Sequence, residues 1–157
     1  MKKIKNNLNS AGFTLMELLT VIGIIGVLAT VMVTAINPGR QLAKARDTQR
    51  ETDVIVILSA IYQYSSEHSG DLPDTDGNPE TSDFPTDETC IGTDLGCFDL
   101  ASAGEDGDTI VPVYLAEIPT DPRTGEASDT DYTIFVDENN RLTASASGET
   151  RTVSVSR

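Results

Sequence analysis

Hydrophobic residues run almost without interruption from Leu18 to Gly39, a stretch of 22 residues without a charged side chain. About 20 apolar residues, at roughly 1.5 Å per residue, span the hydrocarbon core of a bilayer. The pattern therefore predicts a membrane-spanning helix near the amino terminus. The polar segment before it carries Lys2, Lys3 and Lys5. This positive charge predicts that the amino terminus stays in the cytoplasm and that the carboxyl-terminal part lies outside.

A Pro38-Gly39 pair ends the apolar run, and we expect it to kink or locally open the helix, because proline removes a backbone donor. Beyond it, apolar residues recur at steps of three and four until His68 and Gly70, which predicts an amphipathic helix that covers a sheet. We interpret the basic residues Arg40, Lys44, Arg46 and Arg50 as part of its solvated face, with lipid headgroups or acidic neighbouring subunits as further partners. The residues expected on the apolar face are Leu42, Ala45, Thr48, Gln49, Val54, Ile57, Leu58, Ile61 and Tyr62.

The stretch from 69 to 109 contains twelve acidic residues and no Lys or Arg, with Gly and Pro throughout, and we interpret it as a loop. Within it, Asp74, Asp76 and Asn78 bring carboxylate and amide oxygens together around a turn glycine, which makes them weak calcium candidates. The helix-flanked spacing with a final Glu is missing. Solvation of an exported surface is the favoured alternative, and calcium stays open.

The carboxyl-terminal part alternates apolar and polar residues, which is typical of strands. Tyr132, Ile134 and Val136 share one face, a "DENN" turn follows, and a second strand returns through Leu142, Ala144 and Ala146. Val153 and Val155 indicate a third strand. The fold class predicted is α+β, with a long amino-terminal helix, transmembrane and then amphipathic and kinked near Pro38, packed on a small antiparallel sheet.

Charge divides the chain into two parts with different surroundings. Residues 1–50 carry seven Lys/Arg and two acids, a net charge of +5, whereas residues 51–157 carry four Arg and 23 acids, a net charge of −19. Such an acidic region repels phosphate backbones, so no nucleic-acid partner is predicted. The two cysteines, Cys90 and Cys97, enclose six residues, which favours a small disulfide over free thiols if the domain is exported.

Glu17 lies near the start of the apolar run, where an unpaired carboxylate is costly. A polar leader ends in Ala11-Gly12, and the apolar helix follows these small residues, whereas in an ordinary secretory signal it precedes them. Cleavage after Gly12 would free the amine of Phe13, one helical turn from Glu17 in the same chain or close to Glu17 of a neighbouring chain. The other interpretation is a plain signal anchor with Glu17 at the membrane interface.

The stretch "GFTLMELLTVIGIIGVLA" resembles the processing motif of type IV pilins and type II secretion pseudopilins, with matches at Gly12, Phe13, Thr14, Leu15 and Glu17. The resemblance implies that a prepilin peptidase cuts between Gly12 and Phe13 and methylates the Phe13 amine. It implies that Glu17 neutralises a neighbour's terminus and that the apolar helix forms the core of a filament of like subunits. An inner-membrane assembly platform, and the lipid bilayer before assembly, are the further partners implied. The segment "IPTDP" is similar to the Pro-x-Asp-Pro connection before the last strands of related pilins.

Three segments are predicted: a leader at 1–12, a transmembrane and assembly helix at 13–39, and an extracytoplasmic globular domain at 40–157. The function predicted is a structural filament subunit, either a major or minor pilin or a pseudopilin. The alternative is a single-pass membrane-anchored extracellular module for binding or adhesion. An enzyme is not predicted, because the chain has one His, no nucleotide-binding glycine loop and no metal-ligand spacing. No cofactor is predicted, and calcium alone is left open.

Overall fold

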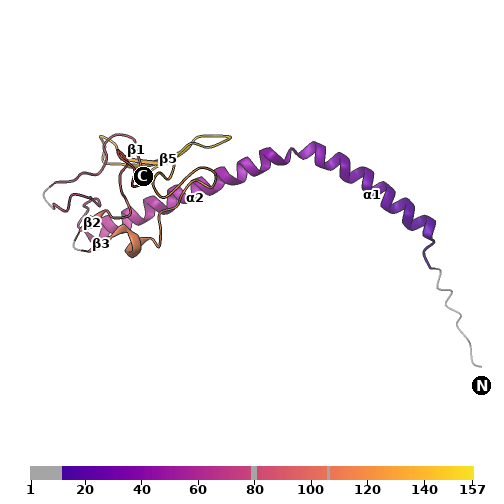
Figure 1. The fold of residues 1–157 in the computed structure, drawn as a ribbon, viewed down its shortest axis with the longest axis horizontal. Coiled ribbons are helices and arrows are strands. Elements are labelled where there is room, and N and C mark those ends of the chain that lie inside the picture. The colour runs from indigo at the N-terminus through magenta and orange to yellow at the C-terminus, as the bar shows by residue number, and fades with distance from the viewer. Residues whose placement is uncertain (1–11, 79–80, 106) are drawn as a thin grey trace, which may run out of the picture. The chain divides into compact units, whose positions relative to one another are not determined.

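The computed structural model describes residues 12–78, 81–105 and 107–157. Of the predicted leader, residues 1–11 lie outside this description. The chain divides into two compact units, with the boundary between Gln41 and Leu42. Figure 1 shows the fold and labels both helices and several of the strands.

The first unit contains α1, which spans Leu15–Ile36, and the first turn of α2, which spans Pro38–Glu67. Between the two helices lies Asn37, whose φ of 45° and ψ of 79° are left-handed and end α1. Pro38 then opens α2, a position where its missing N–H is not needed. The helical run is thus interrupted at Asn37, one residue before the pair on which we placed the kink.

The carboxyl-terminal part of α2 buries the predicted apolar face, including Val54, Ile57 and Ile61. The prediction is wrong for the first two turns of the helix in the second unit. Leu42 remains 60% exposed, whereas Arg50, which we placed on the solvated face, is 2% exposed. The reason is that acidic groups from two loops meet this arginine inside the unit.

Four antiparallel strands form the main sheet in the order β1-β4-β5-β6. Three of them match the predicted meander: β4 at Tyr132–Val136, β5 at Leu142–Ala146 and β6 at Val153–Ser156. Ile134 pairs with Ala144, and Ala144 pairs with Val155, so the predicted inner-face residues share one face of the sheet.

The acidic stretch 69–109 is less irregular than we expected. It contains β1 at Thr89–Cys90, which extends the main sheet beside β4, and a small hairpin of β2 at Gly104–Glu105 and β3 at Asp108–Thr109. A short irregular helical turn, η1, follows at Ile110–Tyr114. Strands of two residues are too short to give an alternating pattern, which is why the sequence did not reveal them.

The second unit has one hydrophobic core, to which α2, the sheet and the acidic stretch all contribute. Burial of these side chains is the main stabilising term of the unit. The buried apolar residues are Val54, Ile57, Leu58, Ala60, Ile61, Tyr64, Phe84, Ile91, Phe98, Leu100, Ala103, Ile110, Tyr132, Ile134, Leu142, Ala144, Ala146 and Val153.

Candidate processing and assembly site

The predicted cleavage site lies just ahead of the first helix. Gly12 and Phe13 are exposed and precede α1, and Phe13 is 91% exposed. A Cβ atom built on Gly12 would meet no heavy atom within 4 Å. Packing within the described chain therefore does not require a small residue at this position. Exposed, non-helical backbone is the form in which a peptidase can bind a cleavage site.

Glu17 belongs to a capping box at the start of α1. Its Oε2 accepts hydrogen bonds of 2.8 Å from the backbone N–H and from the hydroxyl of Thr14, and its own N–H donates to Thr14 Oγ1 at 3.2 Å. These bonds satisfy otherwise unpaired groups of the helix amino terminus. They do not neutralise the charge, because Glu17 forms no ion pair within the described residues.

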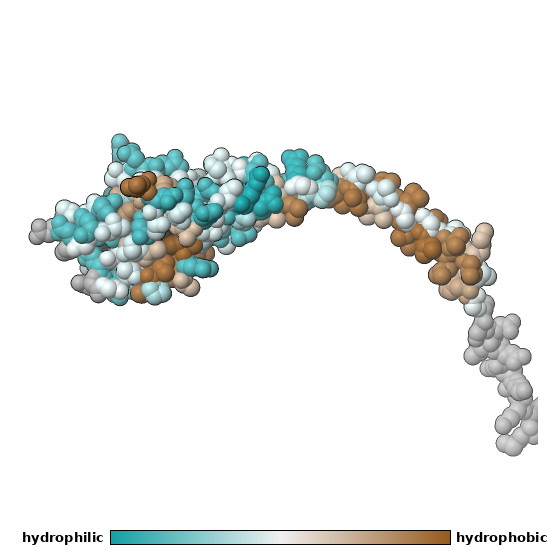
Figure 2. Space-filling model, viewed as in Figure 1, coloured by the Kyte–Doolittle hydropathy of each residue, from teal (hydrophilic) through white to brown (hydrophobic). Residues whose placement is uncertain are grey.

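The surface of α1 is apolar on all sides. Figure 2 shows hydrophobic residues along this helix, and none of its residues is buried in the unit. Thr20, Thr30 and Thr34 donate their hydroxyls to backbone carbonyls of the same helix, which satisfies them without outside partners. In the described residues, α1 is the one helix long enough and apolar enough to cross a membrane.

The start of the second unit contains a buried carboxylate with many partners. Asp47 is 1% exposed and accepts hydrogen bonds from the N–H groups of Glu149 and Thr150, each at 2.8 Å, and from the Thr150 hydroxyl at 2.5 Å. Arg50 Nη1 donates to it at 2.7 Å. A Cβ on Gly148 would lie 2.9 Å from Asp47 Oδ1 and 1.9 Å from a backbone oxygen, so glycine lets this loop approach the helix.

Arg50 joins this carboxylate to a second one. Its guanidinium pairs with both oxygens of Asp121, one through Nη2 at 3.0 Å and the other through Nε. The Arg123 N–H, at 2.8 Å, and the Thr124 N–H, at 3.3 Å, complete the shell of Asp121. One buried cation is thus shared by two buried carboxylates, a geometry that suits the planar fork of arginine.

Glu149 forms the outer edge of this group. It pairs with Arg46 through Oε2 and Nη2 at 2.7 Å, and it lies 3.5 Å from Arg50 Nη1 and 3.7 Å from Arg123 Nη1. We call Arg46, Asp47, Arg50, Asp121, Arg123 and Glu149 the ion cluster.

The ion cluster shifts the pKa values of its acids downwards. The hydrogen bond from Thr150 and those from the backbone outweigh the opposing effect of burial and hold the pKa of Asp47 well below its usual range. Burial raises the pKa of Asp121, but the hydrogen bonds from Arg50 and two backbone N–H groups outweigh it, so the pKa is lowered. The hydrogen bond from Arg46 lowers the pKa of Glu149.

The spacing of two charged residues in the sequence indicates the ion cluster. Asp47 and Arg50 lie three residues apart and precede Val54 by seven and four residues, so they continue the apolar stripe of α2 towards its amino end. Charged residues in phase with a buried stripe indicate a buried ion pair. Their partner Asp121 is the acid of the "IPTDP" segment.

Cys90 and Cys97 form the disulfide that we favoured. The loop that it closes packs against the segment before β4. The N–H of Asp94 donates to the Ser128 carbonyl at 2.9 Å, and the N–H of Thr130 donates to the Ile91 carbonyl at 2.9 Å. The disulfide loop therefore holds both the edge strand β1 and the segment that leads into β4.

The weak calcium candidates lie in one turn, in which the carboxylates of Asp74 and Asp76 accept hydrogen bonds. Asp76 accepts from the Asn78 N–H at 2.7 Å and from the Thr81 hydroxyl at 2.9 Å. Asp74 accepts from the Gly77 N–H at 3.4 Å, and burial raises its pKa. Within the described ranges, no three His, Cys, Asp or Glu residues come together as a metal-binding group. Calcium remains a prediction for this turn.

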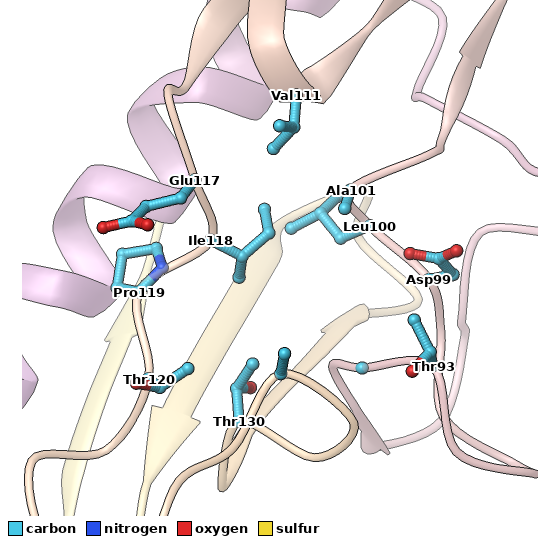
Figure 3. A pocket seen from close by; sticks show the side chains of 12 residues that line it. Thr93, Asp99, Leu100, Ala101, Val111, Glu117, Ile118, Pro119, Thr120 and Thr130 are labelled. Atoms are coloured by element: carbon cyan, nitrogen blue, oxygen red, sulfur yellow. The ribbon is translucent and has the colours of Figure 1, made fainter.

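A pocket of about 400 Å³ lies beside the disulfide loop. Figure 3 shows Ile118 pointing towards Leu100, with Val111 above them. Asp99 and Glu117 are the ionisable residues among its described lining, which includes no His, Cys, Lys or Arg.

The comparison with known families concerns the amino-terminal part. Residues 7–33 match the family model described as "Prokaryotic N-terminal methylation motif", the hallmark of the prepilin-type signals of type IV pilins and pseudopilins. No curated protein and no solved structure matches the chain. The motif, together with the apolar α1 and the α+β fold, supports a pilin-like class of protein. The motif and α1 together indicate membrane anchoring, and proteins of this kind are structural rather than catalytic.

Proposed function

We propose that this chain is a structural subunit of a type IV pilus-like filament, either a major or minor pilin or a type II secretion pseudopilin. A prepilin peptidase cuts between Gly12 and Phe13 and methylates the new amine. The inner-membrane assembly platform then adds the subunit to a filament of like chains through α1. In this filament, Glu17 pairs with the Phe13 amine of a neighbouring subunit.

The observation that carries this proposal is the combination of a matched methylation motif with an isolated charge. Glu17 is the single charged residue of α1, and it has no cation among its described contacts. A carboxylate in apolar surroundings needs a positive partner, because an isolated charge there is strongly unfavourable. Removal of the leader creates such a partner four residues before Glu17.

Two further features support an orientation of the chain in the membrane. Lys2, Lys3 and Lys5 precede α1, and the positive-inside rule keeps them in the cytoplasm. The Cys90–Cys97 disulfide fits an oxidising compartment for the second unit. We infer a single-pass inner-membrane protein whose carboxyl-terminal unit lies outside before assembly and in a periplasmic or extracellular filament afterwards.

The test separates the charge of Glu17 from its capping role. Glu17→Gln keeps an oxygen that can accept from Thr14, because Gln also serves in capping boxes, but it removes the charge. We expect normal membrane levels and at least about a tenfold loss of the chain from sheared filaments. The reason is that the Phe13 amine would lose its partner, and an unpaired charge that costs about 1.4 kcal/mol or more lowers an equilibrium by this factor.

The matched control is Thr14→Val, which removes the cap and keeps the charge. The loss of a cap costs about 1 kcal/mol of local helix stability, so filament yield should stay within a few-fold of the wild type. Normal filaments from Glu17→Gln would contradict the proposed ion pair. If the mature wild-type chain and both variants all remain monomeric in the membrane, the anchored binding module would be favoured.

A further inference from the structure

We propose that the ion cluster is a mechanical clamp that holds α2 in the second unit when the amino-terminal end of that unit is pulled. The clamp itself is a property of the single chain. Its use in a filament under tension rests on the proposed function.

The position of the ion cluster along α2 supports this role. From Leu42 to Ala45 no side chain of α2 is buried in the unit. Arg46 is the first residue with an ion pair to another segment, followed at once by the buried Asp47 and then by Arg50. The apolar contacts of the core begin only at Val54. A force that enters the second unit through the start of α2 therefore reaches the ion cluster before it reaches the core.

The ion cluster also connects segments that are far apart in the chain. Asp47 bonds the loop between β5 and β6 through the N–H groups of Glu149 and Thr150. Arg50 bonds the connection before β4 through Asp121. Removal of α2 from the unit requires the bonds to both segments to break. These bonds are short and directional, so they are lost within a small displacement and resist the force together.

Equilibrium stability does not explain the ion cluster well. A buried ion pair contributes little net free energy compared with apolar residues of similar size, because the desolvation of both charges offsets their attraction. Asp47 and Arg50 nevertheless lie where the helical stripe would otherwise place apolar side chains, and the buried Asp121 meets Arg50 from a loop. Resistance to forced unfolding depends on the unfolding rate and not on the equilibrium free energy, so the two can be separated by experiment.

The experiment pulls on single full-length chains in detergent micelles, with one handle at the exposed Leu42 and the other at the carboxyl terminus. Two variants are compared. Arg50→Met breaks the ion cluster, and Leu58→Ala removes apolar atoms from the core and leaves the cluster intact. Equilibrium unfolding of both variants in denaturant provides the reference for the comparison.

After correction for the equilibrium loss of each variant, the unfolding rate under load should rise at least about tenfold more for Arg50→Met than for Leu58→Ala. Equal corrected rates would overturn the clamp. If Arg50→Met does not fold, Arg50→Lys keeps the charge but loses the two-pronged contact with Asp121, and Ile57→Val becomes the core control. Arg50→Lys should then unfold several-fold faster under load, and a rate equal to that of Ile57→Val would overturn the clamp. If the unfolding rates under load are as expected but the wild-type chain forms no filaments, the result would count against the proposed function and not against the clamp.

Discussion

The two units of the chain each contain a carboxylate near their helical start, Glu17 in the first and Asp47 in the second, and the two differ in their cationic partners. Glu17 and Asp47 both accept hydrogen bonds from a threonine hydroxyl. Asp47 is buried and is neutralised within its own unit by Arg50. Glu17 lies on an exposed apolar helix, and none of its described contacts is with a cation. The buried carboxylate of the second unit is therefore neutralised within that unit, whereas Glu17 has no cationic partner among the described residues.

This difference indicates which part of the chain depends on other molecules. A unit with its own core and its own ion pairs can fold alone, and changes in it should alter stability. An apolar helix with an unmatched charge depends on a membrane or on neighbouring subunits. Changes there should alter processing and assembly but leave the second unit folded.

The largest effect is expected at the cleavage site. Gly12→Val should leave the leader attached, because the resemblance to prepilins places a small residue at the cut and a branched side chain blocks access to it. A Cβ at Gly12 would meet no atom within 4 Å, so we expect no loss of folding from steric clash. Mass spectrometry of the membrane form should find a chain that begins at Met1. A chain that begins at Phe13 at wild-type levels would count against prepilin-type processing.

The next effect is expected at the ion cluster. Asp47→Ala leaves Arg50 with one carboxylate fewer and removes the acceptor of two backbone N–H groups. Breaking a buried pair in this way should cost about 3–5 kcal/mol, measured by denaturant unfolding of the full-length chain in micelles. Leader removal should be unchanged, because the two regions act separately.

Glu51→Ala is the matched control for Asp47→Ala. Glu51 lies on the same helix and pairs with Arg151 of the same loop, but its side chain is 43% exposed and that of Arg151 is 54% exposed. An exposed pair is worth at most about 1 kcal/mol. Similar losses from the two variants would show that burial does not set the strength of these contacts.

The disulfide should have a smaller effect than the ion cluster. Cys90 and Cys97 are separated by seven positions, and closing a loop of this size stabilises a fold by about 2.5 kcal/mol in the chain-entropy view. Replacing both cysteines with Ser should lower the stability of the second unit by this amount and leave the membrane level unchanged. Reductant should destabilise the wild type similarly and have no effect on the variant. Equal sensitivity of both would exclude the disulfide as the cause.

Mild acid should have the smallest effect. The pKa values of Asp121 and Glu149 are lowered in the folded chain, while unfolded Asp and Glu titrate at about 3.9 and 4.3. Their contribution to stability is therefore complete above about pH 5 and is lost as the pH falls through 4 and below. Denaturant midpoints should hardly change between about pH 7 and 5 and then drop. Arg50→Met should weaken this drop, and an unchanged drop would assign the acid sensitivity to other carboxylates.

The sequence predicted those elements whose pattern repeats over many residues. The apolar run of α1, the face with Val54 and Ile57, and the alternation in β4 and β5 all follow from periodic burial. The disulfide followed from the spacing of Cys90 and Cys97. These features are local, so neighbouring residues are enough to reveal them.

The sequence did not reveal features that depend on distant partners. The phase of Arg50 within the apolar stripe indicates burial, but no local pattern identifies its partner Asp121, which lies 71 positions away. β1 has two residues, and only its pairing with β4 makes it a strand. The break at Asn37 depends on a left-handed backbone conformation that asparagine adopts more easily than most residues. In each case tertiary contacts or backbone geometry override the local pattern.

The threonines of α1 have a consequence for how the helix changes surroundings. Since Thr20, Thr30 and Thr34 donate to carbonyls of their own helix, no hydroxyl among these three requires a particular outside acceptor. The helix can exchange acyl chains for the side chains of other subunits without rearranging these bonds. In the proposed filament, the part of α1 beyond its first turn would then exchange mainly van der Waals contacts when it moves from lipid into the fibre, which favours a reversible transfer.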